Sequence, residues 1–216
     1  MNNIFQKQHI AKKLNEFDIN SFYYFTYIEN LKSILENGIL PKNEVLRRGV
    51  EYHSFAEETV QARRHYKHIT LTNHQNYTIH DVVPLYLITK TPTLFARRSE
   101  QSRIIFIKIF AIILQDNAIE FAYTDGNAAS KGSKIYNDLS HLSELPWDVL
   151  SWNVYWQDFP DGKRKRNSEF MIFPYVPVDY IAEFGVSNGD TLHHAQDILT
   201  SNNCKINVKI QYEWFF

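Results

Sequence analysis

Apolar and polar positions follow one another along the chain in short blocks, and the spacing within each block predicts a strand or a helix. Residues 22–28 form a dense aromatic and β-branched run that is typical of a buried strand. Residues 29–38 place apolar side chains on one helical face and end at Asn37-Gly38, a pair typical of a helix C-terminus. Residues 104–109 predict the clearest core strand. The pattern thus indicates strands interleaved with short helices.

Other blocks of the chain carry the same two kinds of signal. Further strands are predicted at 80–88, 120–124, 184–186 and 205–212, with a helix or turn at 112–114. Helices are predicted at 3–17, 43–67, 135–150 and 193–199. No internal repeat, low-complexity segment or linker interrupts the series, so we expect a single domain over residues 1–216.

The composition agrees with one domain and limits its partners. With 216 residues, 44% of them hydrophobic and 15% aromatic, the chain can bury one sizeable core. The formal net charge is -1, so contact with nucleic acid has to come from local basic patches.

Cysteine usage and the N-terminal sequence bear on the compartment. Cys204 is the only cysteine, which excludes an intrachain disulfide and a structural zinc site built of cysteines. The N-terminus lacks a signal-peptide core, and no run approaches the roughly 20 apolar residues of a membrane span. We therefore expect a cytoplasmic protein without membrane association.

Residues 152–170 combine three kinds of side chain that bear on function. The stretch begins with aromatic residues, turns at Phe159-Pro160-Asp161-Gly162, continues with four basic residues and ends at Glu169 before an apolar run. Aromatic faces stack on nucleobases, basic side chains attract phosphates, and a carboxylate at the start of a buried strand has a fixed direction. The stretch is interpreted as a nucleic-acid-binding loop that leads into a catalytic carboxylate. The alternative is a solvated charge run before an edge strand.

Several common site types are not supported. The seven glycines do not form a phosphate-binding loop, which argues against Rossmann and P-loop chemistry. His65 and His68 lie three residues apart, but no further ligands complete a recognised zinc pattern around them. No G-x-S-x-G motif supports a serine nucleophile.

Motifs spread along the chain resemble one family, in the same order. They lie at 22–30, 60–64, 80–86, 91–94, 123–128, 136–139, 145–148, 155–156, 163–170 and 184–186. The most specific combination is Thr124-Asp125-Gly126, Asn137-Asp138-Leu139 and the basic run before Glu169-Phe170. On these residues the chain resembles the DarT family of DNA ADP-ribosyltransferase toxins, over about residues 22–190.

The resemblance implies both a fold and a reaction. The expected fold is α+β and ADP-ribosyltransferase-like, with a bent, mixed β core and helices packed around a cleft. The expected donor is NAD, the acceptor is a base of single-stranded DNA, and no metal is involved. The expected partner is a macrodomain antitoxin of the DarG type, which removes the modification in a toxin–antitoxin or phage-defence system.

The resemblance places Glu169 in the catalytic role. Cleavage of the nicotinamide glycosidic bond passes through an oxocarbenium-like state, and a carboxylate hydrogen-bonded to the neighbouring ribose hydroxyl stabilises that state. The position of Glu169, between a basic loop and the apolar run 170–173, agrees with this role.

The resemblance also assigns a functional arginine to Arg64, with Arg63 as the rival assignment. A guanidinium stays charged and is a poor base, so we expect it to position the target base or the pyrophosphate at least as much as to accept a proton. The alternative is a structural ion pair of one of these arginines with Glu57 or Glu58.

The remaining site residues follow from the same resemblance. NAD is expected to contact Tyr24, Thr26, Asn30, Arg63, Arg64 and Tyr86, and single-stranded DNA is expected to contact Tyr155, Trp156, Lys163, Arg164, Lys165 and Arg166. Tyr24 departs from the family pattern, which often has a histidine there, and Asn127 replaces another common histidine. Tyr24 is therefore either a hydrogen-bonding NAD contact or an aromatic core residue. These departures leave the modified base open.

Two other functions stay open at this level. The same fold and glutamate would also serve transfer of ADP-ribose to RNA or to a protein side chain. A different class is a catalytically silent module that binds single-stranded nucleic acid through the aromatic and basic loop. Turnover of NAD separates the enzymes from the silent module.

Overall fold

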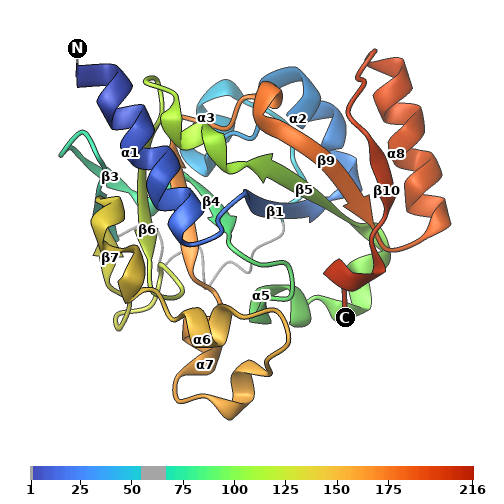
Figure 1. Ribbon diagram of the computed structural model, residues 1–216. Helices are drawn as coiled ribbons and strands as arrows, with labels where there is room; N and C mark the ends of the chain where they lie inside the picture. The colour runs from blue at the N-terminus through green and yellow to red at the C-terminus, as the bar shows by residue number, and fades with distance from the viewer. Residues whose placement is uncertain (1, 55–66) are drawn as a thin grey trace.

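A large, mixed β-sheet forms the centre of the molecule in the computed structural model, which describes residues 2–54 and 67–216 (Figure 1). Its strands lie in the order β10 (Val208–Ile210), β9 (Ile181–Val186), β5 (Ile104–Phe110), β1 (Ser21–Tyr27), β4 (Val83–Tyr86), β8 (Glu169–Phe173), β6 (Glu120–Thr124) and β7 (Ile135–Tyr136). β10 pairs with β9 in parallel, and the other pairs are antiparallel. A separate hairpin consists of β2 (His68–Thr70) and β3 (Asn76–Thr78).

The sheet is held together unevenly at its middle. β1 pairs with β5 along its whole length, from Ser21 opposite Phe110 to Tyr27 opposite Ile104. On its other side, β1 pairs with β4 at one position alone, Tyr23 opposite Tyr86. The two strands therefore separate on leaving this point, and space opens between them.

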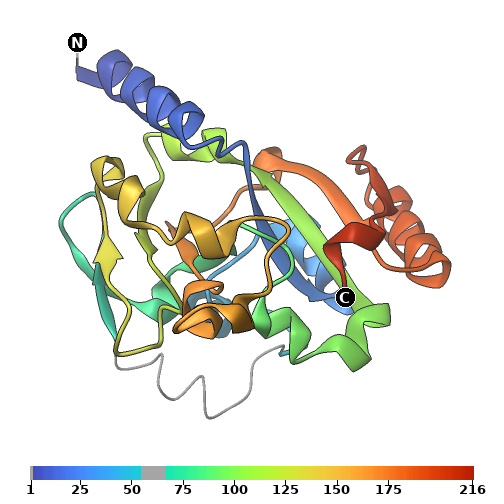
Figure 2. The same cartoon turned by 60° about the horizontal axis from the view of Figure 1, so that its bottom comes forward.

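Helices surround the sheet, and apart from α1 and α8 the described ones are short. The α-helices are α1 (Asn2–Glu16), α2 (Leu31–Asn37), α3 (Lys42–Arg48), α5 (Pro92–Phe95), α6 (Trp147–Leu150), α7 (Gly162–Lys165) and α8 (Gly189–Ser201). The 3-10 helices are η1 (Ile28–Asn30), η2 (Ile79–Asp81), η3 (Arg98–Arg103), η4 (Ala111–Gln115), η5 (Leu139–Glu144), η6 (Trp156–Asp158), η7 (Val178–Tyr180) and η8 (Tyr212–Trp214). Figure 2 shows α6 and α7 together in front of the sheet, with α5 beside them.

The central strands are buried on both faces, which explains why β1 and β5 are almost continuously apolar in sequence. In β1, Phe22 and Tyr24 pack into the larger core cluster, whereas Phe25 and Tyr27 belong to a second cluster. Trp214 closes this second cluster from the C-terminal part of the chain. Alternate residues of one strand thus contribute to two cores.

Most predicted elements are confirmed, including the α+β class with a mixed sheet. The helix predicted at 43–67 is much shorter in the described residues, because α3 ends at Gly49, whose φ of 64° is the left-handed conformation typical of a helix end. The rest of that prediction lies partly at 55–66, outside the described residues. The strand predicted at 205–212 is limited to Val208–Ile210, where β9 provides partners. The segment predicted as helical at 135–150 begins with a short strand, β7.

Within the described part of the chain, no helix has the length and apolar character needed to cross a membrane.

Candidate active site

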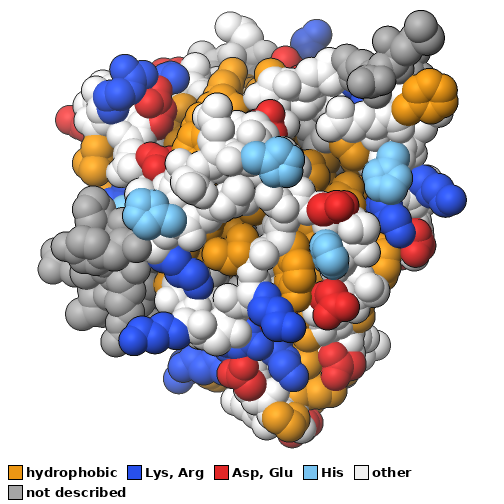
Figure 3. All heavy atoms as spheres, turned by 90° about the vertical axis from the view of Figure 1, so that its left-hand side faces the viewer, with side chains coloured by type: hydrophobic (Ala, Val, Ile, Leu, Met, Phe, Trp, Pro, Cys, Tyr) orange, Lys and Arg blue, Asp and Glu red, His pale blue; other side chains and the backbone are white. Residues whose placement is uncertain are grey.

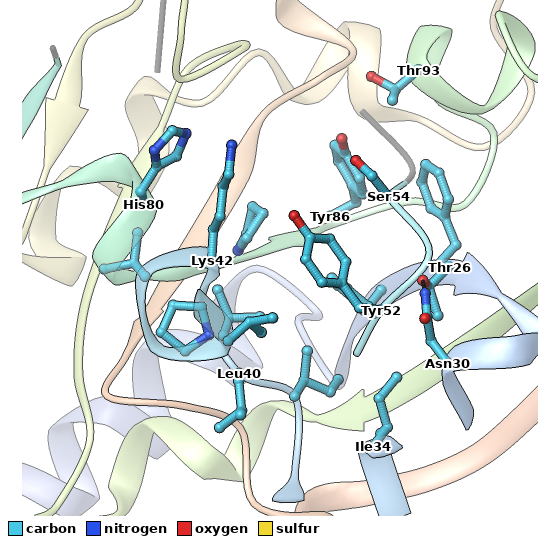
Figure 4. A pocket seen from close by; sticks show the side chains of 18 of the residues that line it. Thr26, Asn30, Ile34, Leu40, Lys42, Tyr52, Ser54, His80, Tyr86 and Thr93 are labelled. Atoms are coloured by element: carbon cyan, nitrogen blue, oxygen red, sulfur yellow. Dashed lines mark hydrogen bonds between the residues drawn. The ribbon is translucent and has the colours of Figure 1, made fainter. Parts of the chain in front are cut away.

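A cavity of about 500 Å³ lies where β1 and β4 separate. Tyr24, Phe25 and Thr26 line it from β1, and Pro84 and Tyr86 line it from β4. Figure 4 shows labelled side chains around this space, with Thr26 and Asn30 on one side and Lys42 and His80 on the other. The volume is in the range of about 300–1,000 Å³ that small-molecule and cofactor sites occupy.

The cavity wall is apolar in one part and polar in another. The apolar part comes from α2, α3 and the residues around them, namely Ile34, Ile39, Leu40, Pro41, Val45 and Val50. The polar part comes from Thr93, Asn127, Lys163 and Asn167, which belong to segments far apart in sequence. An apolar surface beside converging polar groups is typical of a small-molecule or cofactor site.

The described residues that line the cavity include cations but no Asp or Glu. The cations are Lys42, Arg97 and Lys163, and the histidines His53 and His80 also contribute. Such a lining favours an anionic ligand, because no carboxylate in the described wall repels it. Neither Lys42 nor Arg97 was singled out from the sequence, where each lies in an ordinary charged stretch without a motif.

The tertiary structure brings together three residues predicted to contact NAD. Tyr24 and Thr26 lie on β1, and Asn30 ends η1 directly after it. Tyr24 lines the cavity and also packs against the larger core cluster, so both interpretations of this residue have structural support. Thr26 and Asn30 are buried and joined by a hydrogen bond of 2.8 Å from Asn30 Nδ2 to Thr26 Oγ1.

Tyr86 and Glu169 are direct cross-strand partners in the pairing of β4 with β8. Residues opposite each other in an antiparallel pair project to the same face, so Glu169 lies on the face of Tyr86, which lines the cavity. The ring of Tyr86 stacks on Phe25, with centroids 5.4 Å apart. Stacking of this kind restricts the orientation of the tyrosine next to the carboxylate.

Glu169 is a buried carboxylate, with 1% of its surface exposed, and its strand partner Tyr86 lines the cavity. Its Oε1 accepts a hydrogen bond of 3.2 Å from the Ala128 backbone N–H. Its own backbone N–H donates to Thr124 Oγ1 at 3.1 Å, across the β6–β8 pair. The cavity-lining residues Asn127 and Asn167 are near neighbours of Ala128 and Glu169 in the chain, so the carboxylate adjoins the polar part of the wall.

The basic segment, residues 152–167, divides its aromatic side chains between surface and core. Tyr155 is 73% exposed. Trp156 is 8% exposed and packs edge-on against Phe95 and Phe216, with centroids 5.7 Å away in each case. Tyr155 is therefore accessible for stacking, as is Trp152 at 47% exposed, whereas Trp156 anchors the segment to the protein.

The same segment also divides its basic side chains. Arg166 is 2% exposed, and its guanidinium donates to the backbone carbonyls of Lys90, Val149 and Ser151 at 3.2, 2.5 and 2.6 Å. Burial lowers the pKa of Arg166 to about 10. The charge of Arg166 is thus directed at carbonyls of its own chain, and the buried guanidinium is poorly placed for a DNA phosphate.

Arg164 also makes contacts inside the protein. Its Nη1 donates to Asp125 Oδ1 at 2.8 Å and to Ser133 Oγ at 3.1 Å, and its Nε pairs with Asp161. These bonds tie α7 to the loop between β6 and β7. Among the four basic residues of the run, Lys163 and Lys165 are therefore the ones that remain for an external partner.

Two further lysines, Lys131 and Lys134, are exposed on the loop that Arg164 holds against α7. In Figure 3, Lys and Arg side chains gather on the lower part of the face shown. Nothing in the sequence indicated that Lys131 and Lys134 lie near α7, because this proximity depends on the contact between their loop and α7.

The predicted arginines Arg63 and Arg64 lie outside the described residues, as do His65 and the alternative partners Glu57 and Glu58. Of the side chains that the structure describes, no three from His, Cys, Asp and Glu are grouped so that they could hold a metal ion.

Comparison with known proteins gives one matching family model. It is described as "ssDNA thymidine ADP-ribosyltransferase, DarT", and it matches residues 23–216. A DNA ADP-ribosyl transferase of Thermus sp. (strain 2.9) is 27% identical over 172 residues, which are 76% of this chain and 79% of that protein. A DNA ADP-ribosyl transferase of Thermus aquaticus is 25% identical over 185 residues, which are 82% of this chain and 79% of the relative.

Solved structures share the fold. Thermus sp. 2.9 DarT in complex with ADP-ribosylated single-stranded DNA has a TM-score of 0.82 at 24% identity, over 92% of this chain and 97% of that one. The same Thermus protein in complex with NAD+ has a TM-score of 0.78 at 22% identity, over 92% of this chain and 98% of that one.

Proposed function

This chain belongs to the DarT family of single-stranded-DNA thymidine ADP-ribosyltransferases, and on that premise we propose that it transfers ADP-ribose from NAD to a thymidine base. The activity class predicted from the sequence, NAD-dependent ADP-ribosylation of DNA, is confirmed by this membership. One observation carries the proposed site: the buried carboxylate of Glu169 adjoins a cavity whose described lining holds cations and no acidic residue. The base was left open by the sequence, and the family description supports thymidine.

We assign to Glu169 the stabilisation of the reacting sugar. In the reaction, the bond from the ribose C1′ to nicotinamide breaks, and nicotinamide leaves with the bonding electrons. A carboxylate bound to the neighbouring hydroxyl offsets the positive charge that develops on the sugar. An atom of the base then bonds to C1′ and the base loses a proton. The hydrogen bond from Ala128 and the position in a central strand hold the Glu169 carboxylate in place for this role.

NAD is proposed to lie along the cavity with its nicotinamide ribose next to Glu169, near Asn127 and Asn167. The lining cations Lys42, Arg97 and Lys163 offset the negative charge of the diphosphate. Tyr24, Thr26 and Tyr86 contribute from the strands that frame the cavity. Water is displaced by the apolar wall, which strengthens these electrostatic interactions.

Arg64 is proposed to position the acceptor base or the pyrophosphate, with Arg63 as the rival. The chemical reason is that a guanidinium carries a permanent charge and several donors, whereas it accepts a proton poorly. Separate substitutions of the two arginines distinguish them, since the functional one lowers transfer far more than its neighbour.

The acceptor strand is proposed to contact the exposed part of the basic segment. Tyr155 offers a ring for stacking, and Lys163 and Lys165 offer charges for phosphates. Trp156, Arg164 and Arg166 support the segment from inside. Of the six residues predicted to contact DNA, we therefore place three at the acceptor and three behind it.

A macrodomain antitoxin of the DarG type is proposed as the partner that reverses the modification. A Thermosipho africanus protein, described as a fusion of a DNA ADP-ribosyl transferase with a DNA ADP-ribosyl glycohydrolase, is 25% identical over 85% of this chain and 47% of the fusion. Both activities need access to the same DNA, so we place this toxin in the cytoplasm.

The test is to incubate the protein with labelled NAD and oligonucleotides and to locate the added mass by fragmentation. We expect one ADP-ribose on a thymidine of single-stranded DNA, and none on a matched oligonucleotide in which cytidines replace the thymidines. RNA of the same sequence and a protein mixture serve as parallel acceptors. Label on those acceptors alone would overturn the proposed substrate, and oligonucleotide binding without NAD turnover would indicate a silent binding module.

A further inference from the structure

The side chain of Asn30 holds both backbone groups of one distant residue. Its Oδ1 accepts from the His53 N–H at 2.8 Å, and its Nδ2 donates to the His53 carbonyl at 2.9 Å. The second hydrogen of Nδ2 is directed to Thr26 Oγ1 at 2.8 Å. Asn30 is 7% exposed, so these bonds are shielded from water.

The shape of this contact depends on the amide. A primary amide supplies two donors and an acceptor in one plane, which matches the donor and acceptor of one backbone residue and leaves one donor for Thr26. Aspartate has no donor when ionised, and glutamine is longer by one methylene. His53 sets the amide orientation, because its N–H can only donate and its carbonyl can only accept, and the buried Thr26 hydroxyl then accepts from the nitrogen side.

The residue held in this way belongs to a segment that forms a wall of the cavity. Residues 50–54 have no helical or strand structure, yet Val50, Tyr52, His53 and Ser54 all line the cavity. The segment enters from α3 through a hydrogen bond of 3.1 Å from the Val50 N–H to the Val45 carbonyl. In Figure 4, Tyr52 projects into the middle of the space between Thr26 and Lys42. Without regular structure, its position depends on contacts such as those to Asn30.

We propose that Asn30 is a positioning residue, whose amide fixes the wall formed by residues 50–54 and so places Tyr52 and His53 against the bound dinucleotide. The polar atoms of Asn30 bond to the His53 backbone and to the Thr26 hydroxyl, a role beyond the direct NAD contact expected from the sequence, and the residue also lines the cavity. The role rests on the proposed function insofar as the ligand is NAD. The contact itself is a property of the fold and can be tested without any ligand.

The first experiment compares steady-state kinetics of Asn30→Ala and Asn30→Asp with the wild type. Both variants lack the donors to His53 and Thr26, and removal of about two hydrogen bonds corresponds to a rise in the NAD KM of about tenfold or more. kcat should fall less, and the KM for the oligonucleotide should stay within about twofold. A fall in kcat with an unchanged NAD KM would overturn the proposal.

A matched pair tests the acceptor of this contact. Thr26→Val removes the hydroxyl that accepts from the Asn30 amide, whereas Thr26→Ser keeps it. The NAD KM should rise by about two- to tenfold for Thr26→Val and return close to the wild-type value for Thr26→Ser. Equal effects of valine and serine would contradict a role of the hydroxyl in holding the Asn30 amide.

A double-mutant cycle separates a positioning role from direct contact with NAD. His53→Pro removes the N–H that Asn30 accepts, and His53→Ala is its reference, since alanine keeps the backbone groups and removes the same ring. In the His53→Pro background, Asn30→Ala should raise the NAD KM less than it does in the His53→Ala background. If Asn30→Ala raised the NAD KM by the same factor in both backgrounds, Asn30 would contact the ligand independently of residues 50–54.

Hydrogen exchange gives a readout that needs no ligand. In the free protein, the amide of His53 should exchange at least tenfold faster in Asn30→Ala than in the wild type, because its acceptor is removed. Amides of β5 should be unchanged, which excludes global loosening. Equal exchange at His53 in both proteins would overturn the contact. Absence of NAD binding by the wild type, with protected His53, would instead contradict the proposed function and leave the contact intact.

Discussion

The two sides of the candidate site are built in different ways. On one side, the strands β1, β4 and β8 set each side chain by register, and Tyr86 lies opposite Glu169 for that reason alone. On the other side, the basic segment has only the short helices η6 and α7 among its described residues, and side chains that bond to backbone groups hold it in place. Arg166 binds three carbonyls, and Asn167 accepts from Thr93 Oγ1 at 2.9 Å and donates to the Lys163 carbonyl at 3.0 Å.

This difference changes what a charged residue means on each side. In the strands, a buried carboxylate such as Glu169 is costly unless its environment is organised around it, so its presence points to chemistry. In the basic segment, four consecutive cations serve two purposes. Arg164 and Arg166 support the loop, whereas Lys163 is exposed and lines the cavity, and Lys165 is half-buried. A run of like charges is therefore not a single binding site.

The largest expected effect is on the strand side, at Glu169. Removing a preorganised electrostatic group typically costs on the order of 10²-fold or more in rate. Glu169→Ala and the closer analogue Glu169→Gln should both lose ADP-ribose transfer and toxicity while the melting temperature shows that they fold. If Glu169→Gln transferred ADP-ribose at the wild-type rate, the reaction would not need the carboxylate.

On the loop side, Arg166 should govern stability. Arg166→Ala leaves buried carbonyls without their donor, a loss of about 3 kcal/mol in unfolding free energy. For a chain of this size that corresponds to a fall of roughly 6–12 °C in melting temperature. Because the pKa of Arg166 is about 10, the guanidinium stays charged near neutral pH, and the loss should not vary with pH there.

The control for Arg166 is its neighbour Lys165. Replacing Lys165 by alanine also removes one positive charge, but it takes no hydrogen-bond donor away from the carbonyls that Arg166 binds. Thermal unfolding of the two variants side by side checks this contrast. Equal melting temperatures would show that the carbonyl contacts of Arg166 contribute little.

Lys163 and Lys165 should affect the affinity for single-stranded DNA and not the stability of the protein. In Lys163→Ala with Lys165→Ala, the affinity for single-stranded DNA should fall, and the slope of log affinity against log salt should decrease by about 0.7 for each phosphate that is no longer neutralised. The charge-matched control is Lys32→Ala with Lys205→Ala, two exposed lysines on α2 and beyond α8. The same slope change in both double variants would mean that the effect is net charge and not a local contact.

Separate lysine variants sharpen the comparison further. Lys163 lines the cavity, so Lys163→Ala should also raise the NAD KM, whereas Lys165, which is not among the lining residues, should leave it unchanged. An NAD effect from Lys165→Ala alone would place the cofactor nearer the basic segment than we propose.

The smallest expected effect belongs to Tyr24. If its hydroxyl contacts NAD, Tyr24→Phe should raise the NAD KM by about two- to tenfold, which corresponds to the removal of one hydrogen bond of roughly 0.5 to 1.5 kcal/mol. Tyr24→His should then be tolerated. If Tyr24 is a core residue, Phe should leave the NAD KM unchanged and His should lower the melting temperature. Measuring both quantities for both variants decides between the two roles.

Much of the strand side could be predicted from the sequence. Aromatic and β-branched runs located β1, β4, β5 and β6, and in β5 burial on both faces leaves an almost unbroken apolar signal. Glu169 was recognised as a candidate because its carboxylate comes directly before such an apolar run. The order of motifs then identified the family, which the match over residues 23–216 confirmed.

The loop side was decided by tertiary structure. Whether an arginine supports a loop or meets a ligand depends on which carbonyls lie within its reach, and those of Lys90, Val149 and Ser151 come from two distant parts of the chain. The cations Lys42 and Arg97 became site residues because the separation of β1 from β4 brings their segments to one cavity. Asn30 was predicted as a ligand contact and lines the cavity, and only the tertiary structure showed that its amide also meets the backbone of His53. Local sequence determines a strand through its own burial pattern, whereas the partner of a polar side chain is set by what the rest of the fold places beside it.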